Sequence, residues 1–455
     1  MYETRPCFRP TYLINTIRAS FQKSLGPTKP SQKTYTQTDC VLSAFAMFHL
    51  KYPSLLQFDN ACREKDQIQN IKSLYGLEGV PRDTTMRERL DPMDVEPVNQ
   101  AIHDLIGVVQ RSQALQEWDF LGTKLIGLDG TQDFSSSTIH CSSCCEKHLK
   151  NGKITYHHQM LVGAVMSPYQ KQVLPILFEP ICKEDGSEKN DCERNAAKRW
   201  LKNYRSLYPN MPTTIIEDGL SSNAPHIRAL QEARCNFILG AKPDDHTFLY
   251  DWFFSATAPD VIEFTEISGH VKRTYRFMND VPLNETNFDL KVNVLSLDEE
   301  ELPHITKRGK PTKKTLEKRR WVWVTDHTIT KNNAEMMGNI KLIAQGGRCR
   351  WKIENETFNT LKNHGYHFEH NYGHGLKNLS NVLAGIMLLA FLVDQILFAC
   401  NREMQKAFAY QNKTYRYLWE KLRSLFNEWK IDGLESLYHA VFQPPPKPVL
   451  QAVIY

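Results

Sequence analysis

The stretch "TKLIGLDGTQ", residues 123–132, marks a change of pattern in this chain of 455 residues. Apolar residues recur at helical spacing before it, whereas here a short apolar run leads into the pair Asp129-Gly130. Short apolar runs bounded by Gly and Asp are typical of buried strands. Residues 213–222, "TTIIEDGLSS", repeat this form and lead into Asp218-Gly219. The two stretches therefore predict buried strands that each end in a carboxylate.

The segments around these two stretches predict a mixed α/β layout. We expect further strands at 153–168, 172–181 and 236–242, and helices at 189–209 and 224–235. Strand ends are where sites form in open α/β sheets, because side chains converge there without blocking access. Asp-Gly is also a common turn dipeptide, so either acid taken alone also fits an ordinary turn.

The domain plan follows from shifts in the pattern along the chain. Residues 244–325 are rich in strand formers separated by Gly, Asn and Asp, and helical periodicity dominates both ends. The predicted parts are a helical N-terminal domain at 1–118, a first core part at 119–243, a β-rich insertion at 244–325 that we take as an inserted sheet, a second core part at 326–400, and a helical C-terminal region with a Pro-rich tail at 401–455.

Composition gives only broad limits. The chain is 41% hydrophobic and 24% charged, which is ordinary for a globular protein. A net charge of +5 is too mild to indicate nucleic acid by itself. The start of the chain has no apolar segment of a secretory signal, and the apolar run at 382–393 is too short to span a bilayer and precedes Asp394. We expect a buried helix there and no membrane. In a reducing cytoplasm we expect thiols that are free or bound to metal rather than in disulfides.

A third acid lies in "RWKIENETFNTLKNHG", residues 350–365, whose apolar spacing predicts an amphipathic helix. On an α-helix Glu354 shares one stripe with Arg350 and Lys362, whereas Glu356 points away from that stripe. We favour Glu354 over Glu356 as a metal-binding carboxylate. An exposed Arg–Glu pair of little energetic weight is the plain alternative.

Four stretches together resemble the DDE transposases of bacterial insertion sequences, in the group with a Y-R-E-K signature around the third acid. The resemblance covers roughly 120–400 and implies an RNase H-like fold, a mixed sheet with flanking helices and a β-rich insertion between the second and third acids. The stretches are "LIGLDGT" (125–131), "TIIEDGLSS" (214–222), "WVTDHTITKNNAEMM" (323–337) and "GRCRWKIENETFNTLKNHG" (347–365).

The resemblance implies a catalytic triad of Asp129, Asp218 and Glu354. In the family such acids bind two Mg²⁺ (or Mn²⁺) ions, which activate the nucleophile and stabilise the leaving oxygen. Arg350 and Lys362 would then bind DNA phosphates. No organic cofactor is expected.

Two positions depart from the signature. Gly347 stands where the family has Tyr, so the aromatic side chain is missing or has moved. Lys362 follows Glu354 after seven residues instead of six.

A second group of residues suggests structural zinc. Cys141 and Cys144 form a C-x2-C pair, which can present two thiolates to a tetrahedral ion. Free thiols in a loop are the alternative. The preferred ligand set is Cys141, Cys144, a histidine (His157, or His158 in its place) and Cys192.

Two further segments carry expectations about DNA. In residues 363–375 histidines alternate with aromatic residues. This pattern fits either contact with unpaired DNA bases or packing in the protein core. Metal binding is a weaker alternative, because the Gly and Asn residues of the segment indicate a loop, which is less suited to hold several histidines on one metal. Residues 307–320 hold eight Lys or Arg, and Trp321 and Trp323 follow on one side of a strand, facing the core or a flipped base. The candidate phosphate contacts in this run are Lys313, Lys314, Arg319 and Arg320.

The sequence therefore predicts a cut-and-paste DNA transposase of a bacterial cytoplasm, associated with the nucleoid. Its N-terminal helices would recognise terminal inverted repeats, and a homodimer would hold two DNA ends and the target. Two alternatives stay open: an RNase H-like nuclease without strand transfer, and a catalytically degenerate DNA-binding protein.

Overall fold

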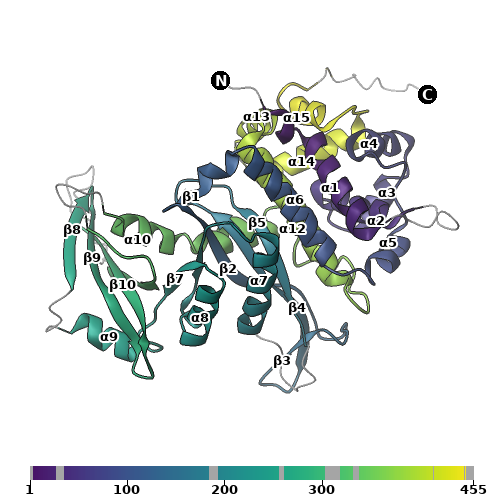
Figure 1. Ribbon diagram of the computed structural model, residues 1–455. Helices are drawn as coiled ribbons and strands as arrows, with labels where there is room; N and C mark the ends of the chain where they lie inside the picture. The colour runs from purple at the N-terminus through teal and green to yellow at the C-terminus, as the bar shows by residue number, and fades with distance from the viewer. Residues whose placement is uncertain are drawn as a thin grey trace, which may run out of the picture.

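The structure is a computed structural model that describes residues 4–26, 35–183, 193–255, 261–302, 318–331, 338–412, 414–444 and 446. Figure 1 shows a helical body at one end, a twisted sheet through the middle, and a strand-rich arm at the other end. The purple N-terminal helices and the yellow C-terminal helices lie together in the helical body. Segments from opposite ends of the chain therefore form one unit.

The helical body is built around α12 (Leu379–Cys400), which packs against α2 (Gln37–His49) and α6 (Glu96–Arg111). A capping box between Thr36 and Asp39 begins α2: the Asp39 N–H donates to the Thr36 hydroxyl, and the Thr36 N–H donates to the Asp39 carboxylate. The other helices of the body are α1 (Pro10–Leu25), α3 (Leu55–Ala61), α4 (Lys65–Tyr75), α5 (Asp83–Leu90), α13 (Arg402–Tyr410), α14 (Tyr415–Glu428) and α15 (Leu434–Phe442), with short 3-10 turns η1 (Pro6–Phe8) and η2 (Ala114–Trp118).

Helix α12 contains the apolar run that we expected to be a buried helix. It is 22 residues long and apolar enough to cross a membrane, but 94% of its most apolar window is buried inside the protein. The neighbours that cover it are α2, α6 and β5 (Leu174–Ile181). The apolar character of α12 is thus accounted for by its place in the core.

A buried polar network joins the two ends of the chain inside the helical body. The Lys51 ammonium lies 2.7 Å from the Asp394 carboxylate on α12, and the Tyr366 hydroxyl donates to the same carboxylate at 2.5 Å. His49 lies 3.5 Å from it. Because the imidazole is buried, its pKa is lowered to about 4. A buried charge needs such partners, so the network links α2 to α12.

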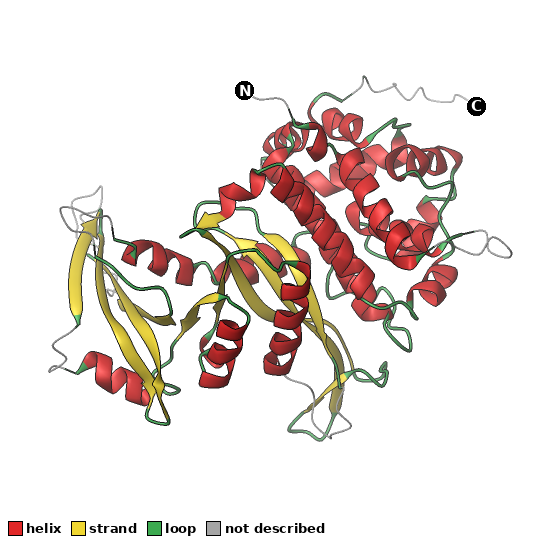
Figure 2. Ribbon diagram, in the orientation of Figure 1, coloured by secondary structure: helices red, strands yellow, loops and turns green. Residues whose placement is uncertain are grey.

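The strands form a single mixed sheet of eleven strands among the described residues (Figure 2). The order is β3-β4-β2-β6-β7-β11-β10-β9-β8, with β1 paired to β2 and β5 paired to β4. The strands are β1 (Asp119–Phe120), β2 (Thr123–Ser136), β3 (Cys145–His148), β4 (Ile154–Met166), β5, β6 (Thr213–Glu217), β7 (Asn236–Gly240), β8 (Ile262–Ser268), β9 (Val271–Asn284), β10 (Asn287–Glu301) and β11 (Lys318–Thr325).

Three parallel strands, β2, β6 and β7, form the centre of this sheet. Helix α7 (Glu193–Leu207) leads into β6, and α8 (Ala224–Glu232) connects β6 to β7. Both helices lie against the sheet in Figure 1, as crossovers between parallel strands do. The parallel pairing of β2 and β6 ends at Gly127 and Ile216, so the residues just beyond it on the two strands lie side by side.

The structure corrects two expectations about the strands. First, β2 does not end at Asp129-Gly130 but continues to Ser136, because β4 pairs with it along that whole length. Second, the strands of the 244–325 segment do not form a separate sheet. Strand β11 pairs with β7, so these strands continue the central sheet. Helices α9 (Thr247–Phe254) and α10 (Ile340–Arg348) flank this arm.

Candidate active site

The first two acids lie on neighbouring parallel strands. The register pairs Gly127 on β2 with Ile216 on β6, and Asp129 and Asp218 each follow two residues later. Paired strands lie about 4.8 Å apart, and side chains two residues on point to the same face. The Asp129 carboxylate accepts the Gly130 N–H at 3.0 Å, and Asp218 accepts the Leu220 N–H at 2.9 Å. These bonds fix both carboxylates at the end of the parallel pairing.

Arg350 brings the third acid to the first. Its guanidinium lies 3.5 Å from an Asp129 oxygen and 2.6 Å from a Glu354 oxygen. The side chain of Asp129 is 23% exposed and that of Glu354 is 48% exposed. Asp129 and Glu354 thus both pair with the Arg350 guanidinium, and both carboxylates are partly exposed to solvent.

Glu354 lies in a π-helical turn, η4 (Ile353–Phe358), which continues as α11 (Asn359–Asn363). A π turn holds one more residue than an α turn and is frequent at functional sites. It therefore accommodates the one additional residue between Glu354 and Lys362. In this structure the Lys362 ammonium pairs with Glu369 at 2.9 Å.

Glu356 faces a different environment. Its charge acts on Lys352 and Tyr415, whose pKa shifts it contributes to, whereas Glu354 acts on Asp129. The Lys352 ammonium in turn donates to the carbonyls of Ser167 and Gln170. This arrangement favours Glu354 over Glu356 as the third acid.

Glu193, at the start of α7, is a fourth carboxylate that sequence reasoning missed. A Cβ on Gly130 would collide with the Glu193 carboxylate, so the missing side chain of Gly130 leaves room for it. The pKa of Glu193 is raised by loss of hydration and then by the charges of Asp218 and Glu217. In the sequence, Glu193 is recognisable only as an acid in the first turn of the helix before β6. That position points to the site only when the strand topology is known.

These carboxylates repel one another and shift the pKa of Asp129. Burial raises the pKa of Asp129 to about 7, helped by the charges of Glu354 and Glu193 and opposed by Arg350. The Lys242 ammonium lies 3.7 Å from Asp218. The site is therefore a cluster of negative charge, with Arg350 and Lys242 as its ion-pair partners among the described residues.

A cavity of about 640 Å³ opens beside Asp218. Its lining includes the basic side chains Lys242, Arg320, Arg348 and Arg350 and the indoles of Trp321, Trp323 and Trp351. Trp323 is buried, while Trp351 is 45% exposed. Basic groups with aromatic faces beside an acidic cluster fit a phosphate backbone and its bases.

Trp323 also accounts for Gly347, the position where the transposase signature has Tyr. A Cβ on Gly347 would lie 2.5 Å from the Trp323 indole. The aromatic ring at this place therefore comes from β11 and not from α10.

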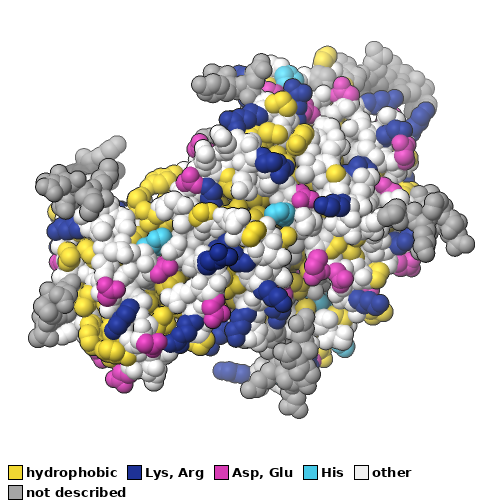
Figure 3. Space-filling model, viewed as in Figure 1, with side chains coloured by type: hydrophobic (Ala, Val, Ile, Leu, Met, Phe, Trp, Pro, Cys, Tyr) yellow, Lys and Arg dark blue, Asp and Glu magenta, His cyan; other side chains and the backbone are white. Residues whose placement is uncertain are grey.

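The candidate phosphate contacts of the basic run are only partly described. Lys313 and Lys314 lie outside the described residues. Arg320 makes a two-bond contact with Asp298 at 2.6 and 2.7 Å, and Arg319 stands opposite Glu299 in the β10–β11 pairing. Figure 3 shows further Lys and Arg side chains over the face where α7 and α8 lie.

The histidine-rich segment is largely part of the core. Tyr366, Phe368 and Tyr372 are 2%, 3% and 5% exposed, which favours packing over stacking on DNA bases. The segment is a loop that connects α11 to α12, and its His374 lies in a separate group of Cys and His side chains whose donor atoms face one another.

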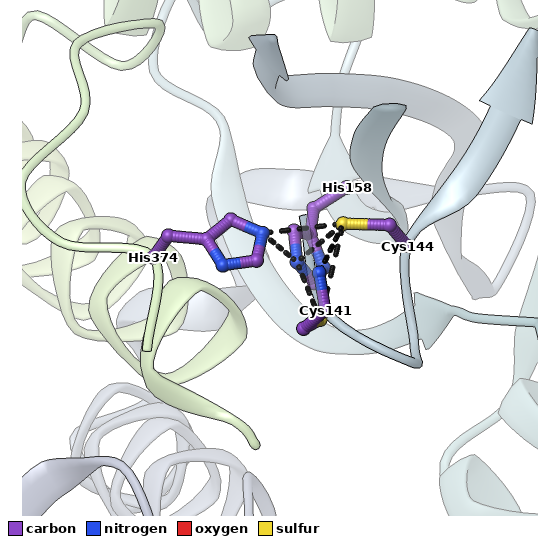
Figure 4. A group of neighbouring side chains, drawn as sticks. All are labelled: Cys141, Cys144, His158 and His374. Atoms are coloured by element: carbon purple, nitrogen blue, oxygen red, sulfur yellow. Dashed lines mark hydrogen bonds between the residues drawn. The ribbon is translucent and has the colours of Figure 1, made fainter. Parts of the chain in front are cut away.

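That group consists of Cys141, Cys144, His158 and His374, whose donor atoms all lie within 4.8 Å of one another (Figure 4). The expectation of His157 is corrected: neighbouring residues on β4 point to opposite faces, and the register turns His158 to the cysteines. Cys192 lies outside the described residues. Hydrogen bonds from Cys144 and the two histidines lower the pKa of the Cys141 thiol. Two sulfurs and two imidazoles are a donor set that suits zinc.

Comparisons with known proteins are sparse. No model of a known family matches the chain, and no curated protein is similar to it. Among solved structures, the chain is similar to a piggyBac transposase in a synaptic complex with hairpin DNA, determined by cryo-electron microscopy. The identity is 12%, the TM-score is 0.40, and the match covers 99% of this chain and 88% of that one. A likeness of this strength carries no conclusion about function.

Proposed function

We propose that this protein is a DDE transposase that cleaves DNA strands at the ends of a mobile element and joins the 3′-OH ends to target DNA. The observation that carries the proposal is the convergence of three acids. Asp129 and Asp218 follow equivalent positions of neighbouring parallel strands, and Arg350 bridges Asp129 to Glu354. The acids come from segments more than 80 residues apart, in the order that the transposase resemblance implies.

The strand order supports the RNase H-like core of the proposal. Strands β5, β4 and β2 are antiparallel, and β6 and β7 then run parallel to β2. The first acid lies on the central strand of these five. The strand-rich arm enters between the second and third acids, as the resemblance implies.

The acidic cluster fits the divalent ions of such an enzyme. Its donors are carboxylates, which Mg²⁺ and Mn²⁺ prefer, and the charges of neighbouring carboxylates help to raise the pKa of both Asp129 and Glu193. Asp129, Asp218 and Glu354 would hold two ions. Bound there, the ions would lower the pKa of an attacking water or 3′-OH and stabilise the leaving oxygen.

Other residues of the chain bind and orient the DNA. Arg350 carries several N–H donors in a planar fork, so it can hold a phosphate beside the carboxylates that it now bridges. Lys242, Arg348 and Arg320 line the same cavity and extend the positive surface away from the acids. Trp351 presents an exposed ring on which an unpaired base can stack.

The remaining parts of the proposal concern the setting. The N-terminal helices would recognise terminal inverted repeats, a homodimer would hold two ends, and the protein would act at the nucleoid of a bacterial cell. Arg319, Lys313, Lys314 and Lys362 are proposed phosphate contacts.

A cleavage and strand-transfer assay tests the proposal, with DNA that carries the inverted repeats flanking the gene. We expect nicks at the repeat ends and joined products in Mg²⁺ or Mn²⁺. Glu354→Gln should lower cleavage by roughly 10²-fold or more, as for loss of one charge-stabilising group, and leave end binding intact.

Glu356→Gln is the matched control, because its carboxylate lies two residues away and acts on other groups. It should cleave like the unaltered protein. Cleavage without joined products would favour the nuclease alternative. Binding without any cleavage would favour a degenerate DNA-binding protein, and equal loss in both variants would refute Glu354 as the third acid.

A further inference from the structure

The search for a second functional site leads to the group of Cys141, Cys144, His158 and His374 (the Cys–His cluster). The two sulfurs lie 3.8 Å apart. The Nε2 atom of His158 lies 3.6 Å from one sulfur and 3.5 Å from the other. The Nε2 atom of His374 lies 3.2 Å from the Cys144 sulfur and 3.1 Å from the other Nε2.

These separations are those of ligands around one tetrahedral ion. With Zn–S bonds of about 2.3 Å and Zn–N bonds of about 2.0–2.1 Å, the S–S, S–N and N–N edges are about 3.8, 3.6 and 3.3 Å. The five distances above agree with these edges within a few tenths of an ångström. Five of the six donor pairs therefore have the spacing of ligands around one zinc ion, and the sixth pair, Cys141 Sγ and His374 Nε2, lies within 4.8 Å.

The tautomer of His374 also points to a cation. Its Nδ1 lies 2.9 Å from the Gly375 carbonyl oxygen, which can only accept a hydrogen bond. In the neutral ring the proton is thus on Nδ1, and Nε2 turns a lone pair toward the cluster. Metal-bound histidines are held by this kind of bond to a carbonyl.

Two other arrangements of these side chains fit less well. A disulfide between Cys141 and Cys144 needs an S–S distance of roughly 2.05 Å, far below the 3.8 Å observed. In a cluster held only by hydrogen bonds, the lone pair of His374 Nε2 faces the Nε2 atom of His158 at 3.1 Å. That arrangement requires a proton on the His158 nitrogen. A cation removes that conflict for all four donors at once.

We propose that the Cys–His cluster binds one Zn²⁺ and acts as a structural clamp across the core. Cys141 and Cys144 lie between β2 and β3, and His158 is on β4. His374 comes from the loop between α11 and α12, and in Figure 4 it reaches the others from the opposite side.

The clamp joins the two halves of the proposed active site. The cysteines follow the strand that carries Asp129, and His374 follows the helical segment that carries Glu354. The other side of the His374 loop is held by the Asp91 carboxylate, which accepts the N–H groups of Leu376, Lys377 and Leu379. Zinc would thus complete the anchoring of a loop whose His374 is 216 residues from His158 and 230 residues from Cys144 along the chain.

The test is the metal content of the purified full-length protein, measured by mass spectrometry of metals, and it does not depend on the proposed DNA chemistry. We expect one zinc per chain. His374→Ala and Cys144→Ser should lose the zinc and lower the melting temperature, whereas His157→Ala, altered at the neighbouring position of β4, should retain it.

A spectroscopic measurement keeps the test decisive if a ligand variant fails to fold. Unaltered protein stripped of zinc and loaded with Co²⁺ should show the visible bands of a tetrahedral ion with two thiolates, and zinc X-ray absorption should show two sulfur and two nitrogen ligands. Absence of both zinc and the Co²⁺ bands would overturn the proposal. So would a His374→Ala protein that retains its full zinc.

Discussion

Among single residues, the carboxylates of the candidate site have unequal surroundings. Asp129 is largely buried on a strand and has a pKa raised to about 7, while Glu354 is half exposed and held by Arg350. Glu193 lies against Gly130, and the charge of Asp218 contributes to its raised pKa. A carboxylate in that position supplies negative charge to any cation at Asp129 and Asp218, even without binding it directly.

Glu193→Gln tests this role. The amide keeps the size of the side chain and removes its charge, so cation binding weakens. We expect the Mg²⁺ concentration for half-maximal cleavage to rise about tenfold, as for loss of an outer-shell group. Titrating Mg²⁺ in the cleavage assay measures it. Glu232→Gln, at the exposed end of α8, is the control, and an unchanged Mg²⁺ requirement in Glu193→Gln would contradict the role.

At the scale of elements, close contacts between helices and strands determine where the acids lie. Helix α10 can lie this close to the sheet only because Gly346 has no side chain against Phe120 of β1 and Gly347 has none against Trp323 of β11. The π turn η4 then begins within a few residues and sets the direction of Glu354. The departure from the Tyr of the signature is therefore a matter of packing between α10 and β11.

Gly347→Ala tests that contact. The added methyl group would meet the Trp323 indole at 2.5 Å, so β11 or α10 has to shift. We expect a loss of about 1–3 kcal/mol in the free energy of unfolding, the usual cost of overpacking. Urea denaturation measures it. Gly433→Ala should cost much less, because its Cβ would meet only Glu435 at 3.9 Å; equal costs would refute the packing argument.

At the scale of the whole molecule, the helical body joins the two ends of the chain through buried polar groups. His49 and Lys51 come from the first fifth of the sequence, and Asp394 comes from α12. The same body packs on the sheet through β5, so its stability bears on the position of the site. The buried His49 makes that stability depend on pH.

The pH dependence has a definite sign. The imidazole has a pKa of 6.5 when unperturbed and of about 4 in the folded protein, so the unfolded chain binds its proton first. Stability is therefore full above pH 6.5 and is lost as pH falls toward 4, by about 3 kcal/mol for this group. Urea denaturation between pH 7 and pH 4 should show this loss in the unaltered protein and a smaller one in His49→Gln. Parallel curves would contradict it.

Much of the local structure was predictable from the sequence. Apolar runs bounded by Gly and Asp located β2 and β6, and the apolar segment at 382–393 located α12, because period and composition are local properties of the chain. The spacing of Cys141 and Cys144 likewise indicated a metal knuckle. The order of Asp129, Asp218 and Glu354 carried the transposase resemblance without any structure.

Only the tertiary structure decided which side chains meet. The choice of His158 over His157 depends on strand register, since neighbouring residues on a strand face opposite sides. His374 and Glu193 reach their partners through a loop and a crossover helix, whose paths no local pattern encodes. The packing of the N-terminal helices against the C-terminal helices likewise depends on contacts between segments far apart in the sequence. Local periodicity thus determined the elements, while packing between distant segments decided the sites.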